Sequence, residues 1–203
     1  MESNRKEHEN MKGLILIGGK SSRMGTDKSE LSYHGISQKE YLRNLLEHKG
    51  IETYYSVSNS SSVISTKVEK SKKSRFIVDN SPDLGPIAGI CSAFQNDPNS
   101  AWLVLAVDLP FIDKQLIDLL VDKRDKSKFA TSVKGISKLA PEPLISIYEP
   151  KAYSIILNYI AMGTLSPKKI LMESDIETLQ VDDSIIRNVN TPEEFREAKN
   201  HLR

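Results

Sequence analysis

Residues 18–28 combine the backbone and side chains that bind phosphate. The segment, Gly-Gly-Lys-Ser-Ser-Arg-Met-Gly-Thr-Asp-Lys, holds three glycines and three cationic side chains. Glycines let backbone N–H groups approach phosphate oxygens closely, and successive N–H groups form an anion-binding concavity. Arg23 and Lys28 could then neutralise a triphosphate. The spacing fits neither the Walker motif nor the dinucleotide fingerprint, and a flexible surface turn with solvated charges is the alternative interpretation.

A carboxylate follows the most apolar run of the chain. Asp108 comes directly after residues 102–107, Trp-Leu-Val-Leu-Ala-Val, and Asp113 is better placed to cap the helix expected next. Asp108 is therefore available to hold a cation. Magnesium usually takes one or two carboxylates together with substrate phosphates. The spacing alone fits a magnesium ligand and an ordinary turn aspartate equally.

The remaining polar motifs and the histidines limit the chemistry. Residues 79–89 are rich in turn-forming residues, and residues 188–194 contain Thr191 and Glu194 at the spacing of a helix capping box, which would explain that motif by itself. The four histidines lie in polar contexts without metal-ligand spacing. No histidine-based nucleophile is therefore expected, whereas phosphoryl-type transfer depends chiefly on positioning and charge stabilisation.

Strands and helices are expected to alternate along the chain. Short apolar runs predict strands, and apolar residues at helical spacing with capping residues predict helices. The expected strands cover residues 13–17, 53–57, 76–78, 102–107, 128–133 and 144–148, and the expected helices cover 38–49, 86–95, 113–121, 151–161, 167–172 and 192–201. The pattern predicts a three-layer α/β/α domain with a mostly parallel, Rossmann-like sheet. Ligands of such sheets gather at the carboxyl ends of the strands.

The composition bounds the domain organisation and the partners. The polar residues 1–11 are expected to be a disordered extension, and residues 12–203 a single domain. With a net charge of +1, the protein is not expected to be attracted electrostatically to nucleic acid or to an anionic membrane. No apolar run is long enough to cross a bilayer. Cys91 is the only cysteine, which excludes an internal disulfide. These features predict a cytoplasmic protein.

Four motifs resemble those of the molybdenum cofactor guanylyltransferases, within the nucleotidyltransferase superfamily of nucleotide-sugar pyrophosphorylase type. Residues 16–28 are similar to the superfamily's Leu-Ala-Gly-Gly signature with its downstream arginine and lysine. Residues 85–89 are similar to Gly-Pro-Leu-Ala-Gly, residues 108–111 to the metal-binding Asp-x-Pro motif, and residues 188–194 to the C-terminal signature. The motifs occur in the family's order, and the resemblance implies a sheet of nucleotide-diphospho-sugar transferase type.

The resemblance also implies a reaction and a role for each motif residue. GMP would be transferred from GTP to the terminal phosphate of molybdopterin, releasing pyrophosphate and forming the guanine dinucleotide cofactor. Arg23, Lys28 and Mg²⁺ bound by Asp108 would stabilise the charge of the reacting phosphates. Asn188 and Asn190 would bind the acceptor. The nucleotide would be bound by Leu16, Ile17, Gly18, Gly19, Lys28, Asn59, Asp79, Gly85 and Asp108.

Several positions depart from the family pattern and keep alternatives open. Ile17 replaces the usual alanine, and residues 138–143 and 166–169, which should shape the acceptor site, also differ. One alternative is a CTP-dependent enzyme acting on molybdopterin or on a sugar or polyol phosphate. Another is a non-catalytic nucleotide-binding accessory protein, although charged groups that are costly to hold together without a ligand argue against it. Transient contact with cofactor-delivery or acceptor proteins is a further expectation.

Overall fold

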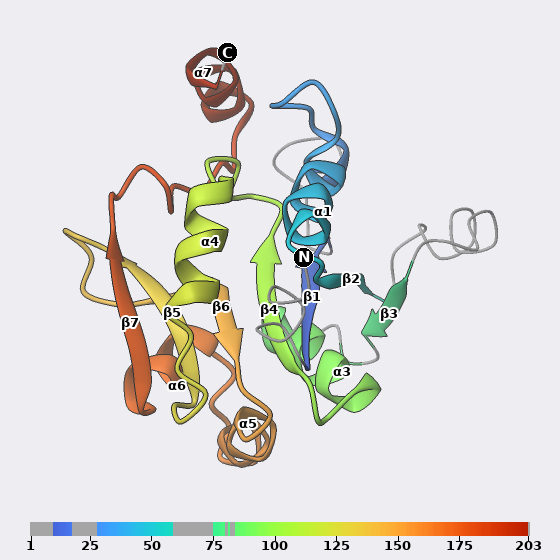
Figure 1. Cartoon of the computed structure of the whole chain (residues 1–203), viewed down its shortest axis with the longest axis vertical. Coiled ribbons are helices and arrows are strands. Elements are labelled where there is room, and N and C mark those ends of the chain that lie inside the picture. The colour runs from blue at the N-terminus through green and yellow to red at the C-terminus, as the bar shows by residue number, and fades with distance from the viewer. Residues whose placement is uncertain (1–9, 18–27, 59–74, 80, 82–83, 203) are drawn as a thin grey trace.

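A single sheet organises the residues that the computed structural model describes, which are 10–17, 28–58, 75–79, 81 and 84–202 (Figure 1). Its seven strands are β1 (Met11–Leu16), β2 (Glu52–Ser58), β3 (Phe76–Asp79), β4 (Ala101–Ala106), β5 (Ala130–Gly135), β6 (Glu142–Tyr148) and β7 (Ile176–Val181). The helices are η2, a short 3-10 helix (Lys28–Glu30), α1 (Gln38–His48), α3 (Pro86–Asn96), α4 (Lys114–Asp122), α5 (Ala152–Ala161), α6 (Pro167–Glu173) and α7 (Pro192–His201).

The strand order is β3-β2-β1-β4-β6-β5-β7, and all neighbouring pairs except those of β6 are parallel. Strand β6 runs antiparallel to both β4 and β5. The predicted mostly parallel α/β sheet is therefore confirmed. Strand β7 has no counterpart among the strands expected from the sequence, because only its last residue is fully buried and its run Ile-Glu-Thr-Leu-Gln-Val, at the sheet edge, contains no continuous apolar stretch.

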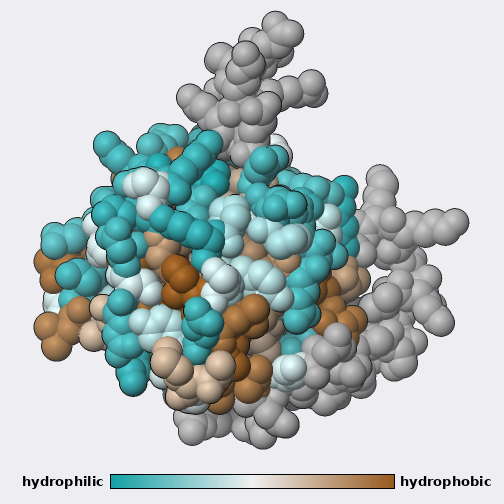
Figure 2. Space-filling view, turned by 90° about the horizontal axis from the view of Figure 1, so that it is seen from below, coloured by the Kyte–Doolittle hydropathy of each residue, from teal (hydrophilic) through white to brown (hydrophobic). Residues whose placement is uncertain are grey.

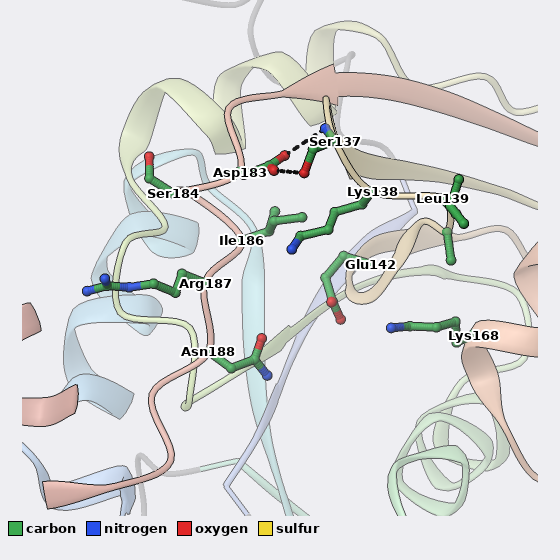
Figure 3. Close-up of a pocket in the computed structure, with 11 residues that line it drawn as sticks. Ser137, Lys138, Leu139, Glu142, Lys168, Asp183, Ser184, Ile186, Arg187 and Asn188 are labelled. Atoms are coloured by element: carbon green, nitrogen blue, oxygen red, sulfur yellow. Dashed lines mark hydrogen bonds between the residues drawn. The ribbon is translucent and has the colours of Figure 1, made fainter. Parts of the chain in front are cut away.

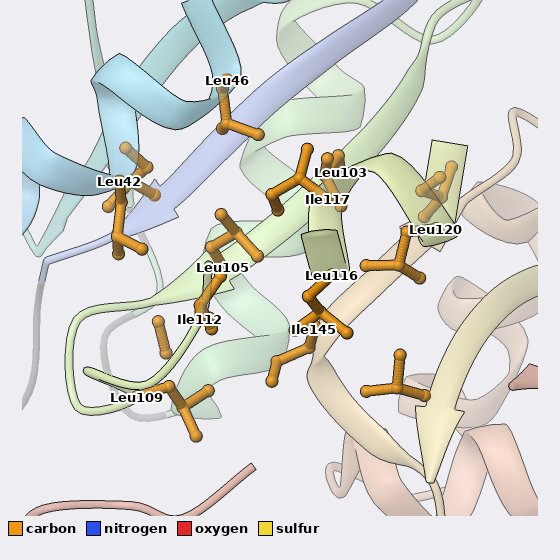
Figure 4. Packing of buried hydrophobic residues seen from close by; sticks show 14 of the residues in the cluster. Leu42, Leu46, Leu103, Leu105, Leu109, Ile112, Leu116, Ile117, Leu120 and Ile145 are labelled. Carbon is orange, nitrogen blue, oxygen red and sulfur yellow. The ribbon is translucent and has the colours of Figure 1, made fainter. Parts of the chain in front are cut away.

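Alternating side chains of the central strands build two separate cores. Ile15 of β1 and Leu103 and Leu105 of β4 pack in one cluster with the leucines and isoleucines of α1 and α4 (Figure 4). Leu14 and Val104 point to the other face, into a cluster with α3, α5 and α6. Burial on both faces explains why β1 and β4 are near-continuous apolar runs, as buried parallel strands usually are. The three-layer α/β/α arrangement is thereby established.

Helix α3 lies unusually close to the sheet because of Gly89. A Cβ atom at this position would come within 2.7 Å of Ser56 Oγ and 2.8 Å of Leu16 Cδ2. Gly85, immediately before the helix, has φ +66° and serves as its N-cap residue, a conformation that favours glycine. The two glycines of the 85–89 motif thus have separate structural roles: Gly85 allows the turn before the helix, and Gly89 allows the helix to pack closely on the sheet.

The topology brings several polar residues to one edge of the sheet. Strands β1, β2, β3, β4, β5 and β7 run in one direction, so their carboxyl ends lie along one edge of the twisted sheet. Strand β4 points toward the end of the molecule where α7 lies (Figure 1). Because β6 is reversed, its first residue, Glu142, lies at that edge. Asp79, Asp108 and the 188–190 segment follow strand ends and reach the same edge. Residues 1–9 of the expected extension lie outside the described residues, whereas Met11 already begins β1.

The surface carries few large apolar side chains. Figure 2 views the molecule from the end near α5, where hydrophilic residues cover much of the coloured surface and apolar residues form separate patches. Leu157, Met162, Leu165 and Met172, from α5, α6 and their connection, are among the exposed apolar residues. Within the described ranges, every helix is too short or too polar to pass through a lipid bilayer.

Replacing Gly89 with alanine should destabilise the fold. The added methyl group must displace Ser56 and Leu16, and overpacking of this kind typically costs about 1–3 kcal/mol. Urea unfolding followed by circular dichroism measures the change. Gln95→Ala, at an exposed position of the same helix, is the matched control and should change the unfolding free energy by less than about 0.5 kcal/mol. Equal stabilities of the two variants would contradict the close approach of α3.

Candidate functional site

Two sequence-distant residues meet at the 188–190 segment. Lys28 Nζ donates hydrogen bonds to Asn190 Oδ1 at 2.6 Å and to the Val189 carbonyl oxygen at 3.3 Å. On the other side, Asn188 Nδ2 donates to Asp108 Oδ2 at 3.3 Å, and the Val189 N–H donates to the Asp108 carbonyl oxygen at 2.8 Å. The segment therefore joins the end of the proposed phosphate loop to the residue that follows β4.

Local capping fixes the position of this segment. The Glu194 carboxylate accepts hydrogen bonds from the backbone N–H groups of Asn190 and Thr191 at 2.6 and 3.0 Å, and Thr191 Oγ1 accepts one from the Glu194 N–H at 3.2 Å. This is the capping box predicted for the start of α7. The box orders the backbone directly after Asn188 and Asn190, so the motif shapes the site as well as the helix.

Asp108 is held in place while one carboxylate oxygen remains without a partner. Asp113 caps α4, accepting a hydrogen bond from the Leu116 N–H at 2.8 Å, as the sequence predicted. Asp108 Oδ1 is buried and has no hydrogen-bond partner among the described residues. Burial raises the pKa of Asp108, while Lys28 and the hydrogen bond from Asn188 lower it. Burial, with Asp108 and Glu194 nearby, also raises the pKa of Tyr33.

The donor set at Asp108 fits a magnesium ion that is shared with a phosphorylated ligand. Asp108 Oδ1 is a hard oxygen whose burial must be compensated. Within the ranges described, no three His, Cys, Asp or Glu side chains form a group that could hold a metal alone. Magnesium commonly completes its coordination with water and substrate phosphates. Asp108 could therefore provide one protein ligand, with phosphate oxygens as the others.

The other expected nucleotide-binding residues lie along the same edge. Ile17 packs partly against the core cluster that includes α1, and its N–H donates to the Ser56 carbonyl oxygen at 3.2 Å, so the larger side chain is accommodated. Leu16 is buried at the end of β1. Asp79 is buried at the end of β3, where Oδ1 accepts from the Ser81 N–H at 2.8 Å and burial raises its pKa. Gly85 is exposed at the start of α3.

Four of the expected site residues cannot be placed against this geometry. Gly18, Gly19, Arg23 and Asn59 lie outside the described residues. Their assignments remain predictions. Lys28, the second cation that the sequence suggested for a triphosphate, is among the described residues, and its charge lowers the pKa of the Asp108 carboxyl group.

A pocket of about 790 Å³ adjoins Asp108 (Figure 3). It is lined by Ser137, Lys138, Leu139, Ala140, Glu142, Lys168, Asp183, Ser184, Ile186, Arg187 and Asn188. Asn188 belongs both to the pocket lining and to the contact with Asp108. Asn190, by contrast, is not among the lining residues and instead contacts Lys28. The two asparagines assigned to the acceptor thus have different surroundings.

Glu142 is a site residue that the sequence did not single out. Burial raises its pKa, while the charge of Lys168 lowers it and that of Asp108 raises it further. Lys168 comes from the start of α6 and Glu142 from the start of β6, and Figure 3 shows both side chains directed into the pocket. The only sequence signal was the unusual run 138–143, since a single glutamate at a strand start has no characteristic spacing.

A comparison with protein families identifies the fold and its nucleotide chemistry. Residues 13–176 match the MobA-like NTP transferase domain. The chain belongs to this family. The match covers most of the chain and includes β1, Asp79, Asp108 and Glu142, and the resemblance stated from the four motifs is confirmed. The chain is therefore a nucleotidyltransferase domain of this type, and residues 188–190 follow the matched range.

Individual relatives agree with this MobA-like assignment. A molybdenum cofactor biosynthesis bifunctional protein of Synechocystis sp. is 32% identical over 90% of the chain, which spans about half (52%) of that relative's length. A probable molybdenum cofactor guanylyltransferase of Natranaerobius thermophilus is 26% identical, with 96% of the chain and 97% of the relative covered. The crystal structure of molybdopterin-guanine dinucleotide biosynthesis protein A from Archaeoglobus fulgidus has a TM-score of 0.73 at 23% identity, covering 94% and 98% of the two chains, and shares the fold.

Replacing Asp108 with asparagine should stabilise the free protein at neutral pH. The pKa of Asp108 is raised in the folded state, so the folded protein binds the proton more tightly and loses stability as the pH rises through that pKa. The uncharged amide of asparagine cannot ionise, so the variant does not lose this stability. The gain in unfolding free energy should be present at pH 7, shrink as the pH falls, and vanish below about pH 4, near the ordinary pKa of aspartate.

Urea unfolding of the wild type and the variant between pH 3.5 and 7.5 measures this effect. Asp113→Ala is the control for an aspartate with a capping role, and it should lose about 0.5–2 kcal/mol. A loss of stability at pH 7 in Asp108→Asn comparable to that of Asp113→Ala would show that Asp108 has a structural role instead.

Proposed function

We propose that the chain transfers GMP from GTP to the terminal phosphate of molybdopterin, releasing pyrophosphate and forming the guanine dinucleotide cofactor. The observation that carries this proposal is the match, over nearly the full length of both chains, to a relative named as a probable molybdenum cofactor guanylyltransferase. The meeting of Lys28, Asp108 and Asn188 beside a pocket supports it. A nucleotide at the carboxyl edge and an acceptor in the pocket would then share one reaction centre.

The reaction needs an acceptor oxygen aligned with the α-phosphorus of the nucleotide. An oxygen of the acceptor phosphate attacks that phosphorus, the bond to the bridging oxygen breaks, and pyrophosphate departs with the bonding electrons. A phosphate anion is already nucleophilic, so no side chain has to remove a proton. The protein's contribution is positioning and charge stabilisation, which typically dominate catalysis of phosphoryl-type transfer.

Lys28 is suited to hold the phosphates. Its ammonium group has three N–H donors, and two are directed to Asn190 and Val189. The third remains for a phosphate oxygen, and the two existing hydrogen bonds fix its direction. The sequence motif assigns Arg23, like Lys28, to stabilising the negative charge of the phosphates. Leu16, Ile17, Gly18 and Gly19 would contribute backbone contacts to the nucleotide.

Asp108 would hold Mg²⁺ through its unpaired Oδ1. When bound, the ion would neutralise the charge on the nucleotide's phosphate oxygens. The hydrogen bond from Asn188 Nδ2 to Oδ2 orients the carboxylate so that Oδ1 stays available. Asp79, farther along the same edge, and Asn59 are assigned to the base or ribose of the nucleotide, and Gly85 is also assigned to nucleotide binding.

A panel of four nucleoside triphosphates tests the proposal. Pyrophosphate release is measured with ATP, GTP, CTP and UTP, each with and without molybdopterin and Mg²⁺. Release should require all three of GTP, molybdopterin and Mg²⁺. A preference for CTP would overturn the base assignment. Release without molybdopterin but with a sugar or polyol phosphate would overturn the acceptor, and binding of nucleotide without any release would favour an accessory protein.

Two single substitutions should affect the reaction differently. Asp108→Asn should lower kcat about 10²- to 10³-fold, because a preorganised group that stabilises transition-state charge is lost. Lys28→Ala should weaken GTP binding about ten- to hundredfold, because a hydrogen bond from a charged donor is worth about 1.5–3 kcal/mol. Calorimetric titration with GTP and steady-state kinetics measure the two effects. The exposed Lys114→Ala is the control, and wild-type kinetics in either site variant would remove that residue from the mechanism.

A further inference from the structure

Three charged side chains of the pocket form no ion pair among the described residues. Lys138, Glu142 and Lys168 point into the pocket (Figure 3). None forms an ion pair with the residues that the structure describes, and the one hydrogen bond to the Glu142 side chain there comes from the Leu144 N–H, at 3.2 Å to Oε1. Glu142 is only partly exposed, and its pKa is raised by burial. Glu142 is therefore a partly buried charge with no ion-pair partner among the described residues, and Lys138 and Lys168 are exposed cations beside it.

Two other charged residues of the pocket are already engaged. Asp183 accepts hydrogen bonds from the Ser137 N–H, at 3.1 Å, and from the Ser137 hydroxyl group. The Arg187 guanidinium lies over the Phe111 ring, 4.7 Å from its centroid, and Figure 3 shows it directed away from the middle of the pocket. The contrast singles out Lys138, Glu142 and Lys168 as the groups still available to a ligand.

The chemistry of the available groups defines the ligand. Burying a charge is costly unless a partner compensates it, so a bound molecule should supply N–H donors for the partly buried carboxylate of Glu142. The exposed ammonium groups of Lys138 and Lys168 line the same pocket and can bind an anionic group of that molecule. The volume of about 790 Å³ lies within the usual range of about 300–1,000 Å³ for small-molecule sites. A phosphate ion alone would leave most of it empty. The ligand should therefore combine an anionic group with a polar ring system.

The pocket is also contiguous with the reaction centre. Asn188 lines it and donates a hydrogen bond to Asp108, and the charge of Asp108 influences the pKa of Glu142. A ligand in the pocket would thus lie beside the nucleotide's phosphates. Glu142 and Lys168 belong to the two segments, 138–143 and 166–169, that the sequence analysis expected to shape the acceptor site. They are positions where this chain can differ in its choice of acceptor.

We propose that Glu142 and Lys168 select the acceptor: Lys168, assisted by Lys138, binds its anionic group, and Glu142 accepts hydrogen bonds from its heterocycle. In molybdopterin, the donors are the amino group and the neighbouring ring N–H of the pterin, which together match the two oxygens of a carboxylate. This inference rests on the proposed function. Both residues are specificity determinants for the acceptor, and the phosphates of the nucleotide remain with Lys28 and Asp108.

Binding of simple pterins tests the two roles separately. Titrations of the wild type, Glu142→Gln and Lys168→Met with 6-hydroxymethylpterin and with its monophosphate can be followed by pterin fluorescence. Glu142→Gln should weaken binding of both compounds about tenfold or more, as expected when a charged hydrogen bond is lost. Lys168→Met should weaken binding of the monophosphate alone. A merely structural role would not distinguish the two compounds in this way.

Lys169→Met is the matched control. Lys169 neighbours Lys168 on α6, but it lies near Glu173, with 3.8 Å between Nζ and Oε1, and is not part of the pocket lining. The Lys169→Met variant should bind both pterins with wild-type affinity. All variants should bind GTP with wild-type affinity, which shows that the nucleotide side is intact.

Turnover separates this inference from the proposed function. With saturating GTP, the KM for molybdopterin should rise about tenfold or more in Glu142→Gln and Lys168→Met, with little change in kcat. If the wild type forms the dinucleotide and both variants keep its pterin affinities and KM, the inference is overturned while the proposed function stands. If the wild type binds the pterins but releases no pyrophosphate with molybdopterin and GTP, the proposed function fails on its own.

Discussion

The contact of residues 188–190 with both Lys28 and Asp108 holds the candidate site together. The segment comes from near the end of the chain, whereas Lys28 follows β1 and Asp108 follows β4. Backbone and side-chain groups of three consecutive residues thus fix a cation and a carboxylate relative to each other. Because the capping box of α7 orders the same backbone, the helix start stabilises the site although it provides no reacting group.

The unpaired Asp108 Oδ1 and the carboxylate of Glu142 in the pocket share one physical character. Asp108 Oδ1 and the Glu142 carboxylate are partly or fully removed from water by folding, and neither carboxylate forms an ion pair among the described residues. Folding alone would favour replacing such groups, since uncompensated buried charge is destabilising. Their presence at one edge of an otherwise well-packed sheet is consistent with a site whose missing partners arrive with ligands.

The sequence predicted the elements that are buried on both faces or marked by caps. The apolar runs of β1 and β4, the Asp113 cap and the Thr191–Glu194 capping box all form as expected. Strand β7 escaped prediction because a half-buried edge strand lacks a continuous apolar run. The position of Glu142 could not be predicted either, because it depends on the reversed direction of β6, which is set by long-range pairing.

The strand order separates the two substrates' surroundings in space. The proposed nucleotide residues follow β1, β3 and β4, whereas the pocket is built mainly from loops beside β5, β6 and β7, on the other half of the sheet. Mutations that reshape one half need not disturb the other. Over evolutionary time, such a division would let an ancestral scaffold keep its means of activating a nucleotide while lineages exchanged the molecule that receives it.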